Sequence, residues 1–188
     1  MKIVALGDSL TAGLGLPTEA VFPVKLAQAL AAKGAKVEVA NAGVSGDTAS
    51  GGLARLDWSV PEGTDAVILE LGANDVLRGV DTAVTRRALD AILARLQERK
   101  IKVLLCGMVA PPNMGADYGA ATKAMFADLA ANRGVVFYPF FLDGVAADEK
   151  LNQRDGLHPT VAGVDVIVAR ILPKVEELIA RVRTARAS

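Results

Sequence analysis

The sequence contains very little of several residue types that mark other classes of protein. A single cysteine, Cys106, excludes an intrachain disulfide, and its position in the apolar run 101–108 favours a buried side chain. Lys plus Arg and Asp plus Glu number 21 each, so the net charge gives no reason to expect nucleic acid as a partner. No uninterrupted apolar run reaches about 18 residues, which argues against stable insertion into a membrane.

No targeting segment precedes the first apolar run, residues 2–6, so the chain as written is expected to be cytoplasmic. If a signal peptide has been removed, the protein is periplasmic or secreted, and the sequence leaves both alternatives open. The sequence gives no reason to expect a cofactor or a metal, and it does not predict the oligomeric state.

Apolar segments of strand length alternate with longer segments of helical period. The expected strands are rich in Val, Ile and Leu without polar alternation, which is typical of strands buried on both faces; they are 2–6, 36–40, 65–71, 101–108 and 135–138. The expected helices are 20–33, about 48–56, 82–99, 116–132 and 160–180. This alternation predicts one α/β domain, residues 1–188, with a parallel sheet between two layers of helices.

Two prolines and a basic tail give expectations for the last helix. Pro159 suits its first turn, whereas Pro173 should kink or divide it. The tail, residues 181–188, is small and basic and is expected to fray.

Small polar residues follow four of the expected strands, at the edge where open parallel sheets bind ligands. These segments are 7–10 (Gly-Asp-Ser-Leu), 41–47 (Asn-Ala-Gly-Val-Ser-Gly-Asp), 72–75 (Gly-Ala-Asn-Asp) and 155–158 (Asp-Gly-Leu-His). Each offers a group that acyl transfer by a serine enzyme needs.

Ser9 is the candidate nucleophile. A serine hydroxyl reacts poorly until a neighbouring base takes its proton, and His158 is the only histidine in the chain. Asp155 lies three residues before His158 and can accept a hydrogen bond from Nδ1, which leaves Nε2 facing the serine. The sequence therefore predicts Ser9, His158 and Asp155 as nucleophile, base and orienting acid.

A tetrahedral intermediate also needs hydrogen-bond donors for its oxyanion. The candidates are the main-chain N–H groups of Ser9 and Gly46 and the side-chain amide of Asn74. A glycine shortly before this asparagine, Gly72, suits a turn that aims the amide over the sheet edge. Each feature alone also has a purely structural interpretation, as a polar turn, a cap or a surface histidine. Their combination at one edge favours catalysis.

At these four segments the sequence resembles the SGNH (GDSL) hydrolase family. Residues 41–43 and 45–48 resemble its bacterial branch of acyl-CoA thioesterase I and arylesterases. The resemblance implies a flavodoxin-like strand order 2-1-3-4-5, and it implies the same roles for the nucleophile, the oxyanion donors and the acid–base pair. Many members of this branch are exported, so it leaves the localisation open.

Other α/β proteins fit less well. The chain lacks a Gly-x-Gly-x-x-Gly or Walker motif, and Ser9 lacks the Gly-x-Ser-x-Gly elbow of α/β-hydrolases. A signalling receiver domain would need a lysine after the fifth strand, where residues 138–141 are Tyr-Pro-Phe-Phe. A metal hydrolase would have only scattered ligands: Asp8, Asp75, Asp155 and His158. A binding protein without catalysis would share the fold, and an assay with a chromogenic acetate distinguishes it from an enzyme.

Two apolar loops, 76–80 and 108–114, are expected to wall the acyl pocket with Leu77, Met108 and Pro111. They offer no cluster of cations to grip phosphate. Aromatic residues are only 4% of the chain, which argues against the stacked platform of a carbohydrate esterase. The sequence predicts an esterase for small aryl and short- to medium-chain acyl esters, acting through an acyl-serine, with thioesters or lysophospholipids as secondary substrates.

Overall fold

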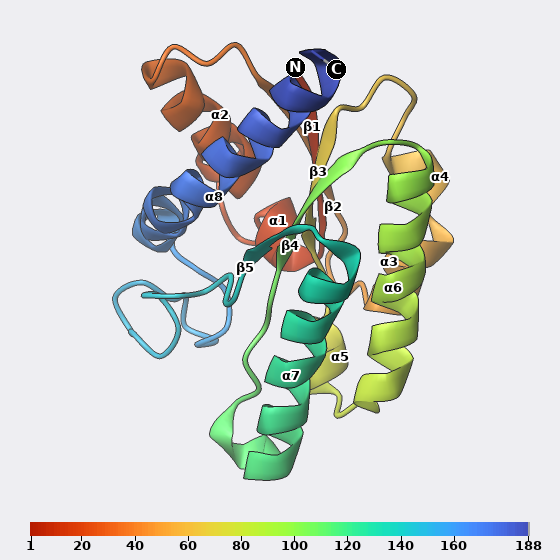
Figure 1. Ribbon diagram of the computed structural model, residues 1–188. Helices are drawn as coiled ribbons and strands as arrows, with labels where there is room; N and C mark the ends of the chain where they lie inside the picture. The colour runs from red at the N-terminus through yellow and green to blue at the C-terminus, as the bar shows by residue number, and fades with distance from the viewer. Residues whose placement is uncertain (188) are drawn as a thin grey trace.

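A five-stranded parallel sheet lies between two layers of helices in the computed structural model, which describes residues 1–187 (Figure 1). The strands are β1 (Lys2–Gly7), β2 (Glu38–Gly43), β3 (Ala66–Glu70), β4 (Lys102–Cys106) and β5 (Val136–Tyr138). Their order in the sheet is β2-β1-β3-β4-β5, which confirms the predicted topology. In this order β1 lies between β2 and β3, so the segments that follow these three strands are neighbours.

Helices cover both faces of the sheet. The long helices are α2 (Phe22–Ala32), α6 (Thr82–Glu98), α7 (Ala116–Arg133) and α8 (Val161–Ala187). Short ones are α1 (Ser9–Ala12), α3 (Ala49–Ala54), α4 (Leu56–Ser59), α5 (Ala73–Leu77) and the 3-10 turns Thr18–Ala20 and Pro112–Met114. α2 and α8 pack together on one face, and α3, α6 and α7 lie on the other (Figure 1). Within residues 1–187, no helix has both the length and the apolar character needed to cross a bilayer.

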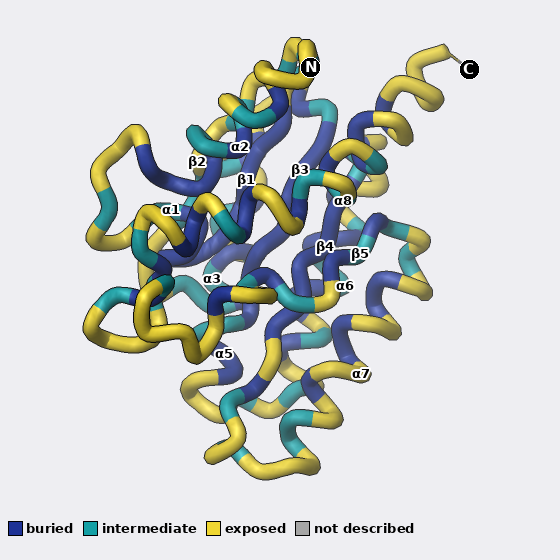
Figure 2. Tube along the Cα trace, turned by 90° about the vertical axis from the view of Figure 1, so that its left-hand side faces the viewer, coloured by how far each residue is buried: buried dark blue, intermediate teal, exposed yellow. Residues whose placement is uncertain are grey.

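The core lies on the central strands, which are dark blue in Figure 2. All five residues of β3 are buried, and Cys106 at the end of β4 is fully buried, as predicted. The expectation that every strand is buried on both faces is wrong for β2, which is an edge strand with mostly exposed or half-buried residues. β2 also runs on to Gly43, since its last three residues stay paired with Ala5, Leu6 and Gly7 of β1.

The last helix differs from the expectation in three ways. It begins after Pro159, which instead forms an isolated bridge with Asn152. Of the two effects expected of Pro173, division does not occur, because apolar side chains beyond the proline, such as Leu178, remain buried against the sheet layer. Residues 181–187 continue the helix instead of fraying, while Ser188 lies outside the described residues.

Candidate active site

The polar segments that follow β1 and β5 meet at the carboxyl edge of the sheet. Ser9 is the first residue of α1, directly after β1, and its Oγ lies 2.8 Å from His158 Nε2. Asp8 caps this short helix, because its Oδ1 accepts a hydrogen bond from the Leu10 N–H at 3.0 Å. The strand end and the cap together fix the serine hydroxyl toward the imidazole.

Asp155 orients the imidazole from the opposite side. Its Oδ2 lies 2.6 Å from His158 Nδ1, and its Oδ1 accepts from the main-chain N–H groups of His158 and Leu157 at 3.0 and 2.9 Å. The His158 N–H, then the Leu157 N–H and the His158 ring, lower the pKa of Asp155 to about 2. The carboxylate is therefore ionised at neutral pH, as an imidazolium partner requires.

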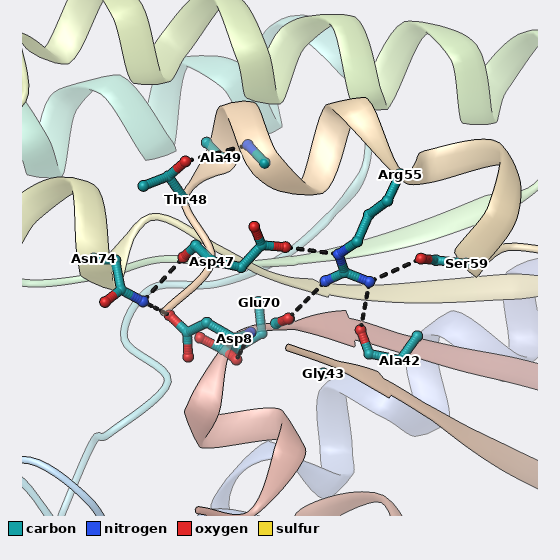
Figure 3. A network of polar contacts seen from close by, with 12 residues as sticks. Asp8, Ala42, Gly43, Asp47, Thr48, Ala49, Arg55, Ser59, Glu70 and Asn74 are labelled. Carbon is teal, nitrogen blue, oxygen red and sulfur yellow. Dashed lines mark hydrogen bonds and ion pairs between the residues drawn. The ribbon is translucent and has the colours of Figure 1, made fainter. Parts of the chain in front are cut away.

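The third polar segment supplies Asn74 from α5. Gly72 is the N-cap of this helix, and its φ of 114° is a conformation that glycine adopts readily and other residues rarely do. The turn brings Asn74 toward the first two strands. Asn74 Nδ2 donates to the Asp47 carbonyl at 2.9 Å and to Asp8 Oδ2 at 3.1 Å (Figure 3). These bonds occupy both amide hydrogens, so any further acceptor at Asn74 would replace or share one of them.

Gly46 lies in the turn between β2 and α3, next to Asp47. Its φ is 82°, in the left-handed region that favours glycine. A Cβ on Gly46 would meet only Arg78 Nη2 within 4 Å, at 3.9 Å, so the space on that side of Gly46 is largely open. Gly46 does not line the cavity beside Ser9, whereas Asn74 does.

Two buried carboxyl groups lie behind Ser9. Asp8 and Glu70 are both fully buried, and burial raises the pKa of Asp8 to about 6. Burial, and then the neighbouring Asp8, raise the pKa of Glu70 well above its usual range. Glu70 Oε2 accepts from Thr11 Oγ1 at 2.6 Å and from the Asp8 N–H at 3.3 Å, while Oε1 is buried without a partner among residues 1–187. Glu70 thus ties the end of β3 to the turn that carries Ser9.

An apolar cavity of about 450 Å³ opens beside Ser9 and His158. Leu77, Met108 and Pro111, the three side chains that the sequence named, all line it. The segment after β5 adds apolar walls that the sequence did not suggest: Phe140, Leu142, Ala146, Ala147 and Leu157. A hollow of about 620 Å³ at the amino-terminal end of the sheet is larger, but none of the candidate catalytic residues lines it.

Sequence reasoning missed three structural features of this site. Glu70 ends an apolar run and Arg55 lies within the expected helix of about 48–56, so neither carries a separate signal in the sequence. Asp75, considered as a metal ligand, is engaged elsewhere: it accepts from the Ala49 N–H at 2.9 Å and from Thr85 Oγ1 at 3.0 Å. It therefore anchors α3 and α6 instead of joining Ser9.

The chain is similar to known proteins over most of its length. Residues 5–166 match the model of the GDSL-like Lipase/Acylhydrolase family. The chain is 38% identical to an arylesterase of Vibrio mimicus, over 84% of this chain and 80% of that protein. It is 35% identical to thioesterase 1/protease 1/lysophospholipase L1 of Escherichia coli (strain K12), over 84% of this chain and 74% of that protein. The crystal structure of TesA matches with a TM-score of 0.90 and 36% identity, covering 95% of this chain and 99% of that chain. The chain belongs to the GDSL-like Lipase/Acylhydrolase family.

Proposed function

We propose that this protein is a serine esterase that hydrolyses aryl and short- to medium-chain acyl esters through an acyl-Ser9 intermediate. One observation carries the proposal, namely the continuous chain of hydrogen bonds from the Ser9 hydroxyl through the His158 imidazole to the Asp155 carboxylate. Ser9 Oγ lies 2.8 Å from His158 Nε2, and His158 Nδ1 lies 2.6 Å from Asp155 Oδ2.

In the first half of the reaction, His158 Nε2 takes the hydroxyl proton as Ser9 Oγ attacks the ester carbonyl carbon. Asp155 stabilises the imidazolium that results. The tetrahedral oxyanion receives hydrogen bonds from the Ser9 N–H, the Gly46 N–H and the Asn74 amide. The C–O bond to the leaving group then breaks, and His158 returns its proton to the departing alcohol or phenol.

In the second half, a water molecule replaces the alcohol. His158 takes a proton from the water, whose oxygen attacks the acyl carbon, and the second tetrahedral intermediate uses the same donors. The bond to Ser9 Oγ breaks, Oγ regains its proton from His158, and the free acid leaves. No other reactant is needed, because one ester and one water molecule give one carboxylic acid and one alcohol.

The cavity supports an apolar acyl or aryl group. Leu77, Met108 and Pro111 offer hydrocarbon walls beside Ser9. The polar side chains of the lining are those of Ser9, His158, Asp8, Asn74 and Asn152. Related proteins carry the names arylesterase and thioesterase 1/protease 1/lysophospholipase L1. We therefore include thioesters and lysophospholipids as secondary substrates.

The deciding experiment replaces the nucleophile. Ser9→Ala should lower kcat for p-nitrophenyl acetate by about 10⁴- to 10⁶-fold, because the acyl-enzyme cannot form. A fluorophosphonate probe should label the wild type at Ser9, as peptide mass spectrometry would show. Ser50→Ala, which changes an exposed serine on α3, is the matched control and should keep full activity. Labelling at another residue, or near-normal turnover in Ser9→Ala, refutes the proposal.

A further inference from the structure

Arg55 stands between the short helices α3 and α4, and its side chain reaches the ends of β1 and β2 (Figure 3). The side chain is 20% exposed. Nε donates to Asp47 Oδ2 at 2.6 Å, and Nη2 donates to the Gly7 carbonyl at 2.9 Å. Nη1 donates to the Ala42 carbonyl at 2.9 Å and to Ser59 Oγ at 2.8 Å. One planar group therefore makes four short hydrogen bonds.

Three of these acceptors belong to the segments that carry the candidate oxyanion donors. Gly7 lies two residues before Ser9, at the point where β1 ends. Ala42 is in the last part of β2, which leads into the turn that contains Gly46. Asp47 directly follows Gly46, and its carbonyl oxygen accepts from Asn74 Nδ2. The guanidinium thus connects directly to two of the donor segments and, through Asp47, to the third.

Main-chain and side-chain hydrogen bonds together hold the turn at Gly46. The Asp47 N–H donates to the Val44 carbonyl at 3.1 Å, and the Arg55 and Arg78 side chains both reach the turn. The space where a Cβ would stand is open, with only Arg78 Nη2 within 4 Å. Arg78 also donates to the Gly46 carbonyl at 3.0 Å, but from an exposed position. The bond from Arg55 to Asp47 is less exposed to water than the Arg78 bond, and it ties the residue that follows Gly46 to the ends of β1 and β2.

We propose that Arg55 is a positioning residue. It holds the main-chain N–H groups of Ser9 and Gly46 and the side-chain amide of Asn74 at the positions from which they can bind the oxyanion together. Arg55 does not line the cavity beside Ser9 and acts only through the segments it binds. The inference rests on the proposed esterase function, since it assigns the donors to that reaction. A lysine cannot replace the arginine fully, because one ammonium on a flexible stem does not match acceptors that lie in different directions.

The test compares Arg55→Met with Arg55→Lys. Arg55→Met should lower kcat by about 10- to 100-fold, because donors displaced by a fraction of an ångström stabilise the transition state less. KM should stay within about 3-fold, since the acyl pocket is unchanged. Arg55→Lys should recover part of the loss by binding Asp47. An aryl boronic acid, which adds to the serine as a tetrahedral adduct, should lose affinity in step with kcat.

Arg133→Met is the matched control for loss of a half-buried, ion-paired arginine. Arg133 donates to both oxygens of Asp90 at 2.7 and 2.6 Å, with a side chain 27% exposed, and it lies at the end of α7 away from Ser9. The Arg133→Met substitution should lower the melting temperature of the protein without changing kcat or boronate affinity. Rates are divided by the concentration of active sites titrated with the fluorophosphonate, so unfolded protein does not contribute to the enzyme concentration.

The outcomes separate the positioning role from the proposed function. A wild type without ester turnover refutes the function. An active wild type with undiminished kcat in Arg55→Met refutes only the positioning role, and so does an equal loss in Arg133→Met or a change confined to KM. If Arg55→Met does not fold, Arg55→Lys decides, because wild-type kcat and boronate affinity in that variant would contradict the proposal.

Discussion

The two halves of the candidate site are built differently. Ser9 and the candidate oxyanion donors follow the ends of β1, β2 and β3, backed by buried carboxyls and by Arg55. His158 and its carboxylate lie on the irregular segment 139–160, between β5 and α8 (Figure 1). The Asp155 side chain is 44% exposed, whereas Asp8 is fully buried.

The two aspartates show what this difference achieves. Burial raises the pKa of Asp8 to about 6, whereas main-chain N–H groups lower the pKa of Asp155 to about 2. A carboxylate that stabilises an imidazolium must stay ionised, so it lies near water and accepts hydrogen bonds. A carboxyl that only shapes a turn tolerates burial. The strand-end half, with Ser9 and the candidate oxyanion donors, is thus suited to stabilising the negative charge of the transition state. The loop half, with His158 and Asp155, is suited to proton transfer.

Among the residues that support Ser9 and His158, replacement of Asp155 should have the largest effect. Asp155→Asn should lower kcat/KM for an aryl ester by up to about 10⁴-fold, because the imidazole loses its orienting partner and adopts the wrong tautomer. The pKa of Asp155, about 2, keeps the wild-type carboxylate charged, so the defect should persist throughout about pH 5 to 8. Asp143→Asn, an exposed aspartate of the same segment paired with Arg170, should behave as wild type. Comparable rates in both variants would remove Asp155 from the mechanism.

Replacing Asn74, in the strand-end half, should lower the rate less than replacing Asp155 does. Asn74→Ala should lower kcat by about 10²- to 10³-fold with little change in KM, because one donor of several is lost in the transition state. Steady-state kinetics with one aryl ester measure both constants. Asn132→Ala, an exposed asparagine on α7, is the control and should leave both unchanged. A raised KM with kcat intact would mean that Asn74 binds the ground state instead.

A third change tests the buried carboxyls through stability instead of rate. The folded-state pKa of Glu70 is raised, so its contribution is fully present below the unfolded pKa and is lost as pH rises through the folded pKa. Glu70→Gln removes this loss, so its unfolding free energy relative to the wild type should rise between about pH 5 and 8. Each unit of pKa shift removed corresponds to about 1.4 kcal/mol.

Urea unfolding at the two pH values measures this difference. Glu149→Gln, an exposed glutamate, is the control and should track the wild type at both values. If Glu70→Gln loses stability relative to the wild type as pH rises, then the Glu70 carboxyl is ionised in the folded protein and the two halves do not differ as described.

The smallest effect is expected in the acyl pocket, which both halves border. Met108 is 3% exposed and Leu77 is 45% exposed, so Met108→Ala should shift the preferred ester chain length more than Leu77→Ala. Each methylene buried contributes about 0.8 kcal/mol, or about 4-fold in kcat/KM, until the pocket is full. A series of p-nitrophenyl esters measures the optimum, with Val84→Ala on α6 as control. An optimum that neither variant moves would place the acyl group elsewhere.

The sheet and the contacts of the candidate nucleophile and base could be predicted because they rest on local patterns. Strands such as β3 are continuous apolar runs, and Gly-Asp-Ser and Asp-x-x-His stand directly beyond secondary-structure elements. β2 was harder, because an edge strand is half exposed and its polar end, Asn41 to Gly43, is held by pairing with β1. α5 has five residues, too few for a helical period.

The supporting residues could not be predicted because their roles depend on contacts between distant segments. Arg55 binds carbonyls 48 and 13 residues away in the chain, and Glu70 binds Thr11 across 59 residues. The continuity of α8 beyond Pro173 likewise follows from burial of its apolar face, which outweighs the hydrogen bond that proline cannot make.

The separation of Ser9 from His158 has a consequence for synthesis of the chain. These residues are 149 positions apart, and the strands β2 to β5 lie between them. During translation Ser9 emerges first, and His158 follows only after every strand of the sheet has been made. Esterase activity on the ribosome should therefore appear late and abruptly, which would make turnover a reporter of completed folding in this protein.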